Sequence, residues 1–333
     1  MKAVRLILVI LIWTATGLAA VQPYVGNWLA SYLLLFTLWV MPLFVVNLLL
    51  LGWLMYKRSA YSYPHLFFTI LSLYLFGRSF NIPIVHDHGT GASVIRLASC
   101  NVENFLLDRK VVEETALAIA GHSPDIVCLQ ERPHTSLLSR DSVFDVFDYA
   151  YTAVNDREDE VLNLAILSRW PLVDKEDYYF PDSYNKFIQV DIQHPDGMIR
   201  LFNVHLQTTG ITLQTEFSLL EQFRRNAWWR NLQADRLAEE IKKSPYPVIV
   251  CGDFNDTPLS YAYHKVSHQL LDAFKEAGTG WGGTYQTIGN LFRIDYMLCS
   301  TDWNVTDYKL LSNPWSDHRI QLGELQLTAL QKE

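Results

Sequence analysis

Six short polar motifs lie between residues 99 and 319, each of them at the end of an apolar, strand-like run. They are Cys100-Asn101-Val102-Glu103-Asn104, Leu129-Gln130-Glu131, Asn203-Val204-His205-Leu206, Gly252-Asp253-Phe254-Asn255-Asp256, Arg293-Ile294-Asp295-Tyr296 and Ser316-Asp317-His318-Arg319. Together they supply carboxylates, amides and imidazoles, which can hold a hard divalent cation and move protons. One such motif would be weak evidence, but six of them predict a site that hydrolyses a phosphate ester.

Two carboxylates in these motifs are candidate metal ligands. Glu131 follows the apolar run 126–129, so its side chain is expected where a strand opens to solvent, and Asp317 offers a second carboxylate. One or two carboxylates and a substrate phosphate are enough for Mg²⁺, which keeps several of its waters. Taken alone, each of these acids could equally cap a helix or pair with an arginine.

Asp253 and Asn255 flank Phe254, so in an extended segment their side chains point the same way. A carboxylate beside an amide suits the deprotonation of a water next to a phosphate oxygen. The alternative is a plain turn, because Gly, Asp and Asn all favour turns. A turn explains the composition but not the apolar run directly before it.

Two histidines, His205 and His318, are embedded in the motifs. A histidine that stabilises a pentacovalent phosphate should be cationic or donate a proton, and a neighbouring acid would hold its ring. Asp295 is the candidate partner for His318. Each histidine alone is more often structural, and the other eight histidines are assigned no role.

The first quarter of the chain is apolar. Residues 1–85 are predicted to form a membrane module with three transmembrane helices, over about 4–21, 29–56 and 64–85, and residues 86–93 to form a linker. A signal peptide ending near residues 17–20 is the alternative for the first run. The catalytic domain is expected over 94–328.

Basic residues set the expected topology. Lys2 and Arg5 favour a cytoplasmic N-terminus, and Lys57-Arg58 favours a cytoplasmic loop after the second span. A third crossing then places the catalytic domain on the periplasmic side, whereas a third run that lies along the surface leaves it in the cytoplasm. We expect the first arrangement, a multi-pass protein of the bacterial inner membrane with its lipid bilayer as partner.

Strand-like and helix-like runs alternate after the linker. Strands are expected over 94–100, 125–129, 163–167, 187–192, 199–204, 248–251, 294–298 and 320–327, and helices over 108–121 and 232–243. Many strands with few helices between them predict an α/β (α+β) architecture of two packed, mixed β-sheets with helices outside.

The net charge bears on the substrate. Residues 1–92 carry five basic residues and one acid, which leaves 22 basic and 34 acidic residues in 93–333, a formal charge of −12. Proteins that bind nucleic acid tightly usually present a basic surface, so this balance disfavours a nuclease without excluding a locally basic groove. The four cysteines form no CxxC pair and are expected to be buried thiols.

The six motifs, in this order over about residues 94–326, resemble the endonuclease/exonuclease/phosphatase (DNase I-like) superfamily, which includes nucleases, neutral sphingomyelinases and inositol polyphosphate 5-phosphatases. The resemblance implies a four-layered sandwich and a Mg²⁺ cofactor, for which Mn²⁺ can substitute. The apolar segments ahead of the domain resemble membrane-anchored members from Bacteroidetes-type bacteria. Fold and site chemistry follow from such a resemblance, but the substrate does not.

Residue roles follow from the same resemblance. It implies that Glu131 is the principal metal ligand, with Asn101 and Asp317 close to the metal or its waters. Asp253 would activate the attacking water, and Asn255 and His205 would contact the scissile phosphate. His318 would stabilise developing charge with its ring fixed by Asp295, and Arg293 would brace the site. Glu103 receives no role.

The segment 208–230 is the part of the domain most relevant to substrate. Its end carries Arg224, Arg225, Trp228, Trp229 and Arg230. Such a basic-aromatic stretch suits stacking on bases or lying at a lipid interface, and an amphipathic helix that covers the sheet is the alternative. The substrate is therefore left as a phosphate ester, with nucleic acid and phospholipid- or sphingomyelin-type phosphodiesters as competing classes and a non-catalytic scaffold as a remote one.

Overall fold

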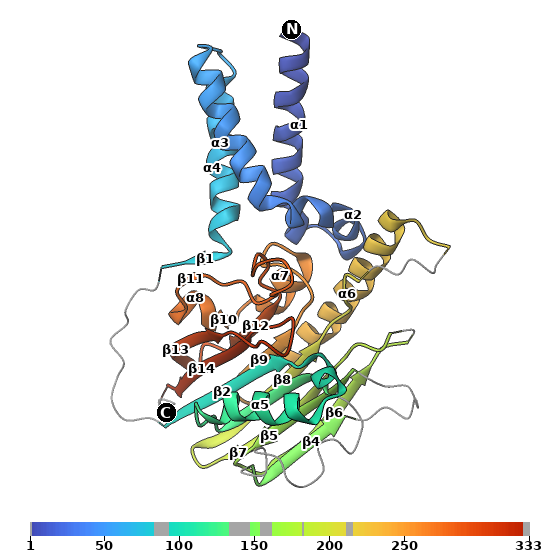
Figure 1. The fold of residues 1–333 in the computed structure, drawn as a ribbon, viewed down its shortest axis with the longest axis vertical. Coiled ribbons are helices and arrows are strands. Elements are labelled where there is room, and N and C mark those ends of the chain that lie inside the picture. The colour runs from blue at the N-terminus through green and yellow to red at the C-terminus, as the bar shows by residue number, and fades with distance from the viewer. Residues whose placement is uncertain are drawn as a thin grey trace.

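The computed structural model describes residues 2–82, 93–132, 147–153, 162–181, 183–210 and 216–328. Figure 1 shows a helical module, formed by the first part of the chain, standing on one end of a β-sandwich formed by the rest. Residues 86–92 of the predicted linker lie outside the described residues.

Two mixed sheets of six strands each form the sandwich. Along the chain their strands are β2 (Val94–Asn101), β3 (Ile126–Arg132), β4 (Tyr149–Ala153), β5 (Asn163–Ser168), β6 (Leu172–Tyr179), β7 (Lys186–His194), β8 (Gly197–His205), β9 (Val248–Asp253), β10 (Leu271–Asp272), β12 (Asp295–Cys299), β13 (Trp303–Leu311) and β14 (Ile320–Leu327). One sheet has the order β10-β12-β9-β8-β7-β6 and the other β13-β14-β2-β3-β5-β4. The pairs β8/β9 and β2/β3 are parallel, so polar residues at their C-terminal ends meet at one end of the sandwich.

Helices cover the outer faces of the sheets, which gives four layers (Figure 1). The core between the sheets is aliphatic, with Leu97, Ile166, Leu201 and Ile249 among its members. On the outer faces, α5 (Arg109–Ala120) packs on the sheet that contains β2, and α6 (Leu219–Lys242) and α7 (Tyr261–Ser267) pack on the sheet that contains β9. A short helix, α8 (Ala273–Ala277), follows β10. The predicted two-sheet sandwich with flanking helices is confirmed.

All eight predicted strands are present. In the two six-stranded sheets, the strands missing from the prediction are β4, β6, β10 and β13, which are the four edge strands. Central strands are buried on both faces and read as apolar runs. Edge strands carry polar and charged residues that discourage pairing with another chain, and β6, with the sequence LVDKEDYY, is typical. The prediction missed them for this reason.

The helical module consists of α1 (Lys2–Val21), the 3-10 turn η1 (Gln22–Tyr24), α2 (Asn27–Leu38), α3 (Val40–Tyr56) and α4 (Ser62–Gly77). In Figure 1, α1, α3 and α4 run side by side away from the sandwich, and α2 lies at their base beside α6. Polar groups join the three long helices: Asn47 Nδ2 donates to Thr16 Oγ1 at 3.0 Å, and Trp13 Nε1 donates to His65 Nδ1 at 2.9 Å. The outward faces carry exposed apolar side chains, including Leu11, Leu49 and Phe67 at 59, 68 and 63% exposure.

The membrane prediction needs correction at its second segment. Within the described residues, one helix, Arg5–Tyr24, is long and apolar enough to cross a bilayer by itself. The predicted helix over 29–56 is broken at Trp39 into α2 and α3, which are bent by 60° and count as a second span only if taken together. With this bend α2 lies against α6, where Asn231 Nδ2 donates to the carbonyl of Asn27 at 2.9 Å.

The predicted third span, 64–85, is also shorter than expected, because α4 ends at Gly77. The chain beyond it is tied to the sandwich: β1 (Phe80–Asn81) pairs with β11 (Gly280–Trp281). Asn81 Nδ2 donates to the carbonyls of Phe274, Lys275 and Gly278 at 2.8–2.9 Å. These hydrogen bonds hold Phe80–Asn81, which was predicted to be part of the span, against the sandwich.

Candidate active site

Five of the predicted site residues line one cavity of about 520 Å³ at the end of the sandwich: Glu131, Asp253, Asn255, Asp317 and His318. Three others, Asn101, His205 and Asp295, are buried and contact these residues through hydrogen bonds or close charges. They come from the ends of β2, β3, β8, β9 and β12 and from the turn before β14. The predicted convergence of the six motifs is therefore observed.

Asp253 lies at the centre of this group. The Asn255 backbone N–H donates to Asp253 Oδ1 at 2.7 Å, and the Asn255 side-chain amide donates to Oδ2 at 3.1 Å. Asn101 Nδ2 donates to the same Oδ2 at 3.1 Å and to Glu131 Oε1 at 3.0 Å. Asn101 therefore connects the two carboxylates across the gap between the sheets.

The backbone is strained where it presents these groups. Glu131 and Asn255 both have positive φ, 55° and 54°, a conformation that is uncommon outside glycine. At Glu131 the pairing of β3 with β5 shifts register between Leu129 and Arg132, so the bulge turns the carboxylate out of the ladder. Strain at both residues serves to aim their side chains at the cavity.

Gly252 allows the close approach of β9 to β8 beneath the site. Its φ is 130°, and a Cβ at this position would lie 2.1 Å from the carbonyl oxygen of Val204. No side chain fits there. The glycine of the motif is thus required to bring Asp253 next to His205, with which it is paired in register.

His318 is held by Asp295. Its Nδ1 lies 2.9 Å from Asp295 Oδ2 and 3.0 Å from Oδ1, while its Nε2 lies 3.7 Å from Asp253 Oδ2 and 3.6 Å from Asp317 Oδ1. Burial disfavours the charged ring, but the charges of Asp295 and Asp253 outweigh burial and raise the pKa of His318 well above its usual value. His318 is therefore an imidazolium that directs one N–H toward the cavity.

His205 has the opposite character. Burial, followed by the charge of His318, lowers its pKa to about 3, so the ring is neutral. Its Nε2 lies 3.5 Å from Glu131 Oε1 and 3.7 Å from Asp253 Oδ2. The site thus contains one neutral and one cationic histidine, each facing the same carboxylate.

Glu103 belongs to the site although the sequence assigned it no role. Its Oε2 accepts a hydrogen bond from the backbone N–H of Asp317 at 3.0 Å, and its own N–H donates to Asn101 Oδ1 at 3.1 Å. Its φ is 46°. The signal was its place two residues after Asn101, where an Asx-type turn carries it back over the site.

Two arginines act outside the cavity. Arg293 Nη1 pairs with Asp272 at 2.7 Å, and Arg293 is not among the residues that line the cavity. Arg230 is fully buried rather than exposed for stacking: its Nε donates to Asp256 Oδ2 at 2.8 Å and its Nη1 donates to the carbonyl of Gln207 at 2.9 Å. Arg230 therefore braces the two loops that border the cavity.

Five carboxylates crowd the site, those of Glu103, Glu131, Asp253, Asp295 and Asp317. Burial, followed by the charge of neighbouring acids, raises the pKa values of Glu103, Asp253 and Asp317, that of Asp253 to about 8, and burial also raises the pKa of Glu131. Fully ionised, this oxygen-rich set would carry more negative charge than His318 compensates, and this excess adds to burial in raising the pKa values. Asp253, Asp295 and His318 each offer a ligand atom within 4.8 Å of the others. The donor set fits a hard divalent cation, which would relieve the repulsion.

The opposite wall of the cavity is apolar. Phe223 of α6, Ile288 and Phe292 line it, and so does Leu38, the last residue of α2. The helical module thus contributes a side chain to the cavity that contains Glu131, Asp253 and Asp317.

Comparisons with known proteins agree with this geometry. The Endonuclease/Exonuclease/phosphatase family profile matches residues 98–318. A search of functionally curated proteins gives no match.

Several solved structures share the fold. An endonuclease/exonuclease/phosphatase from Bacteroides vulgatus has a TM-score of 0.54 and 20% identity, over 71% of this chain and 99% of that chain. One from Beutenbergia cavernae has a TM-score of 0.54 and 17% identity, over 70% and 72%. D. rerio TDP2 complexed with single-strand DNA product has a TM-score of 0.54 and 17% identity, over 70% and 99%.

Proposed function

We propose that this chain, which belongs to the endonuclease/exonuclease/phosphatase family of phosphoester hydrolases, is a membrane-anchored enzyme that depends on a divalent cation. Mg²⁺ is the proposed cation, with Mn²⁺ as a substitute. The observation that carries the proposal is the convergence of carboxylates, amides and an Asp-supported histidine on one cavity.

Glu131 and Asp317 would hold the cation, with Asn101 fixing Glu131 from behind. The set of Asp253, Asp295 and His318 is a less suitable holder, because Asp295 already accepts the ring N–H of His318. A bound Mg²⁺ supplies charge neutralisation at the phosphate oxygens.

Asp253 would orient and deprotonate the attacking water for in-line displacement. Three N–H donors, from Asn101 and Asn255, fix its carboxylate, which leaves little freedom for misorientation. The neutral His205 would donate a hydrogen bond to the scissile phosphate, and Asn255 would contact it by exchanging the hydrogen bond that its amide gives to the carbonyl of Leu206. The cationic His318 would stabilise the charge that develops on the phosphate.

The catalytic roles can be tested on the full chain with a soluble phosphodiester such as bis(4-nitrophenyl) phosphate. Asp253→Asn and His318→Ala should each lower kcat by at least ~10²-fold, and a chelator should abolish turnover until Mg²⁺ is restored. Asp196→Asn, at an exposed position, is the matched control and should leave kcat unchanged. Hydrolysis near the normal rate by both site variants would reject the assignment.

The anchoring proposal rests on the helical module. Its long helices expose apolar side chains to an extent that is unusual for a protein in water. Arg5 stacks on Trp53 with its Cζ 4.8 Å from the ring, so the start of α1 and the end of α3 lie together, far from the sandwich (Figure 1). The basic residues of both therefore gather at one end, which favours three crossings by α1, α3 and α4 with that end cytoplasmic and the catalytic domain outside.

Taken alone, α3 with 17 residues and α4 with 16 are roughly 26 and 24 Å long, shorter than a usual span. Their crossing therefore requires thinning of the bilayer, or for α4 snorkelling of Arg78. A reporter enzyme that is active only outside the cytoplasm, fused after Thr328, should be active. A reporter that is active only in the cytoplasm would contradict the topology if it worked at the same position.

A lipid phosphodiester is the proposed substrate class, because the cavity joins catalytic carboxylates to an apolar wall that includes Leu38 of the helical module. Nucleic acid is the competing class, since D. rerio TDP2 was solved with single-strand DNA product. The formal charge of −12 over residues 93–333 argues against nucleic acid as the substrate. Full-length protein in vesicles should hydrolyse a phospholipid or sphingolipid faster than single-strand DNA or sugar phosphates, and the reverse order would reject the lipid.

A further inference from the structure

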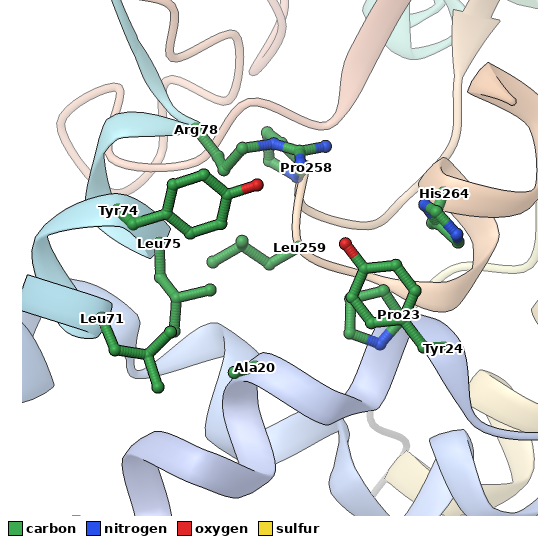
Figure 2. Close-up of a pocket in the computed structure, with 10 residues that line it drawn as sticks. All are labelled: Ala20, Pro23, Tyr24, Leu71, Tyr74, Leu75, Arg78, Pro258, Leu259 and His264. Atoms are coloured by element: carbon green, nitrogen blue, oxygen red, sulfur yellow. The ribbon is translucent and has the colours of Figure 1, made fainter. Parts of the chain in front are cut away.

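A second cavity, of about 190 Å³, lies at the junction between the helical module and the sandwich (Figure 2). One side of it is formed by the end of α1, by η1 and by the last turn of α4, and the other by Pro258, Leu259 and His264 before and within α7. It is separate from the active-site cavity, with which it shares no lining residue.

Arg78 is the charged group of this cavity. Figure 2 shows its guanidinium directed into the space that the hydroxyls of Tyr24 and Tyr74 also approach. The Tyr74 side chain is its hydrogen-bond partner, and no carboxylate of the described chain forms an ion pair with it. Asp272, whose charge acts on the neighbouring Lys275, already binds Arg293 through two contacts of 2.7 and 2.9 Å.

More positive charge lies nearby without a free counter-ion. Lys275 Nζ donates to the carbonyls of Gly77 at 3.1 Å and Phe80 at 2.8 Å, so its ammonium lies against the end of α4. The junction thus presents an excess of cations and hydroxyl donors, which suits an anion.

Apolar side chains line the rest of the cavity on the side of the helices. Leu71 and Leu75 of α4 form this part (Figure 2), and the outward face of α4 continues it with exposed Ile70 and Leu73. A cation at the end of a membrane helix with an apolar strip leading away from it matches a phospholipid, whose phosphate lies at the interface and whose chains lie in the bilayer.

We propose that this cavity binds the phosphate of an anionic phospholipid from the surrounding bilayer. The inference rests on the membrane insertion proposed above, but not on catalysis. The binding loop matters for the enzyme, because Pro258 and Leu259 directly follow Thr257, which lines the active-site cavity. A bound lipid would thus hold the helical module against the loop that carries Asn255.

The test uses full-length protein in detergent micelles, in the Asp253→Asn background so that no lipid is consumed. Thermal unfolding is followed with short-chain phosphatidic acid, short-chain phosphatidylcholine or inorganic phosphate. Phosphatidic acid should raise the Tm more than the other two. Arg78→Gln should weaken its binding by at least roughly tenfold, the cost of one charge-assisted hydrogen bond. Arg58→Gln, which removes the same charge at the far end of α4, should not change it.

Two further variants keep the test informative if Arg78→Gln does not fold. Arg78→Lys retains the charge, and Tyr74→Phe removes only the hydroxyl that bonds the guanidinium; both should weaken binding by several-fold. The proposal is overturned if inorganic phosphate protects as well as the lipid, if Arg58→Gln weakens binding equally, or if all the variants at residues 74 and 78 bind like the parent.

Discussion

Asp295 controls the state of His318 from a position that does not face the cavity. Its two oxygens accept from Nδ1, which fixes the ring and keeps the proton on Nε2 available to the substrate. The prediction is that Asp295→Asn lowers kcat by about 10²-fold or more with little change in KM, because the amide permits the wrong tautomer without moving the ring. Steady-state kinetics on the soluble phosphodiester test this, with the exposed Asp196→Asn as the control. Equal kcat values for the two variants would show that Asp295 only fills space.

Glu103 holds Asp317 through the backbone of the latter. Groups of this kind, one step behind a metal ligand, usually change metal affinity by 10–100-fold. Glu103→Ala should therefore raise the Mg²⁺ concentration for half-maximal activity by about tenfold, while the rate at saturating Mg²⁺ stays within a few-fold of the parent. Glu113→Ala on the exposed face of α5 serves as the control. If the Mg²⁺ titration of Glu103→Ala superimposed on that of the parent, Glu103 would have no role in Mg²⁺ affinity.

At the scale of elements, α6 supports the site through one buried side chain. Arg230 joins the helix to Asp256 and to the carbonyl of Gln207, and so to both loops beside the cavity. Arg230→Ala leaves the buried Asp256 carboxylate without its charged partner and should cost about 3–5 kcal/mol of unfolding free energy, or a fall in Tm of roughly 10 °C. Arg225→Ala, earlier in the same helix and exposed, should lower the Tm by less than about 2 °C. A similarly small change in Tm for Arg230→Ala would mean that the two loops keep their structure without Arg230.

Sequence reasoning succeeded for elements whose burial is uniform. The central strands are buried on both faces, so β9 with Val248 to Cys251 and β7 with Phe187 to Ile192 read as strands, and the chemistry at their ends could be assigned to one site. The edge strands could not be found in this way, because they are partly exposed to solvent and their polar residues interrupt the apolar runs. The first part of α6 was predicted only as one of two alternatives for the segment 208–230. The structure has the helix there, although its apolar residues Leu219 and Leu220 are exposed.

The site residues divide along a similar line. Asp253, His205 and His318 could be located because they end strands, but the role of Glu103 depends on a turn with positive φ that composition does not specify. Asn203 is a second case. It was quoted only as part of a motif, yet its Nδ2 donates to the carbonyls of Leu129 at 3.0 Å and Ala165 at 2.9 Å and so ties the two sheets together under the site.

At the scale of the whole molecule, the helical module and the sandwich share their functional surfaces. Both cavities described above lie along their junction: one contains Asp253, Asp317 and Leu38, and the other contains Arg78. Exposed Trp28 and Trp39 lie on the module next to the junction, as expected for side chains at a membrane interface. The acidic domain would then face a substrate that it does not need to attract by charge, because the bilayer supplies it.

Leu38 provides the test of that arrangement. Leu38→Ser should lower the rate of hydrolysis of a long-chain phospholipid in vesicles by about tenfold, since the side chain's apolar contact with the substrate is worth roughly 1–2 kcal/mol. Hydrolysis of bis(4-nitrophenyl) phosphate, which has no acyl chain, should be unchanged. Leu29→Ser, on the same helix and outside the cavity lining, should affect neither reaction. Equal losses of rate on both substrates would mean that Leu38 supports the fold of the site. No loss on either substrate would mean that the helical module does not take part in substrate binding.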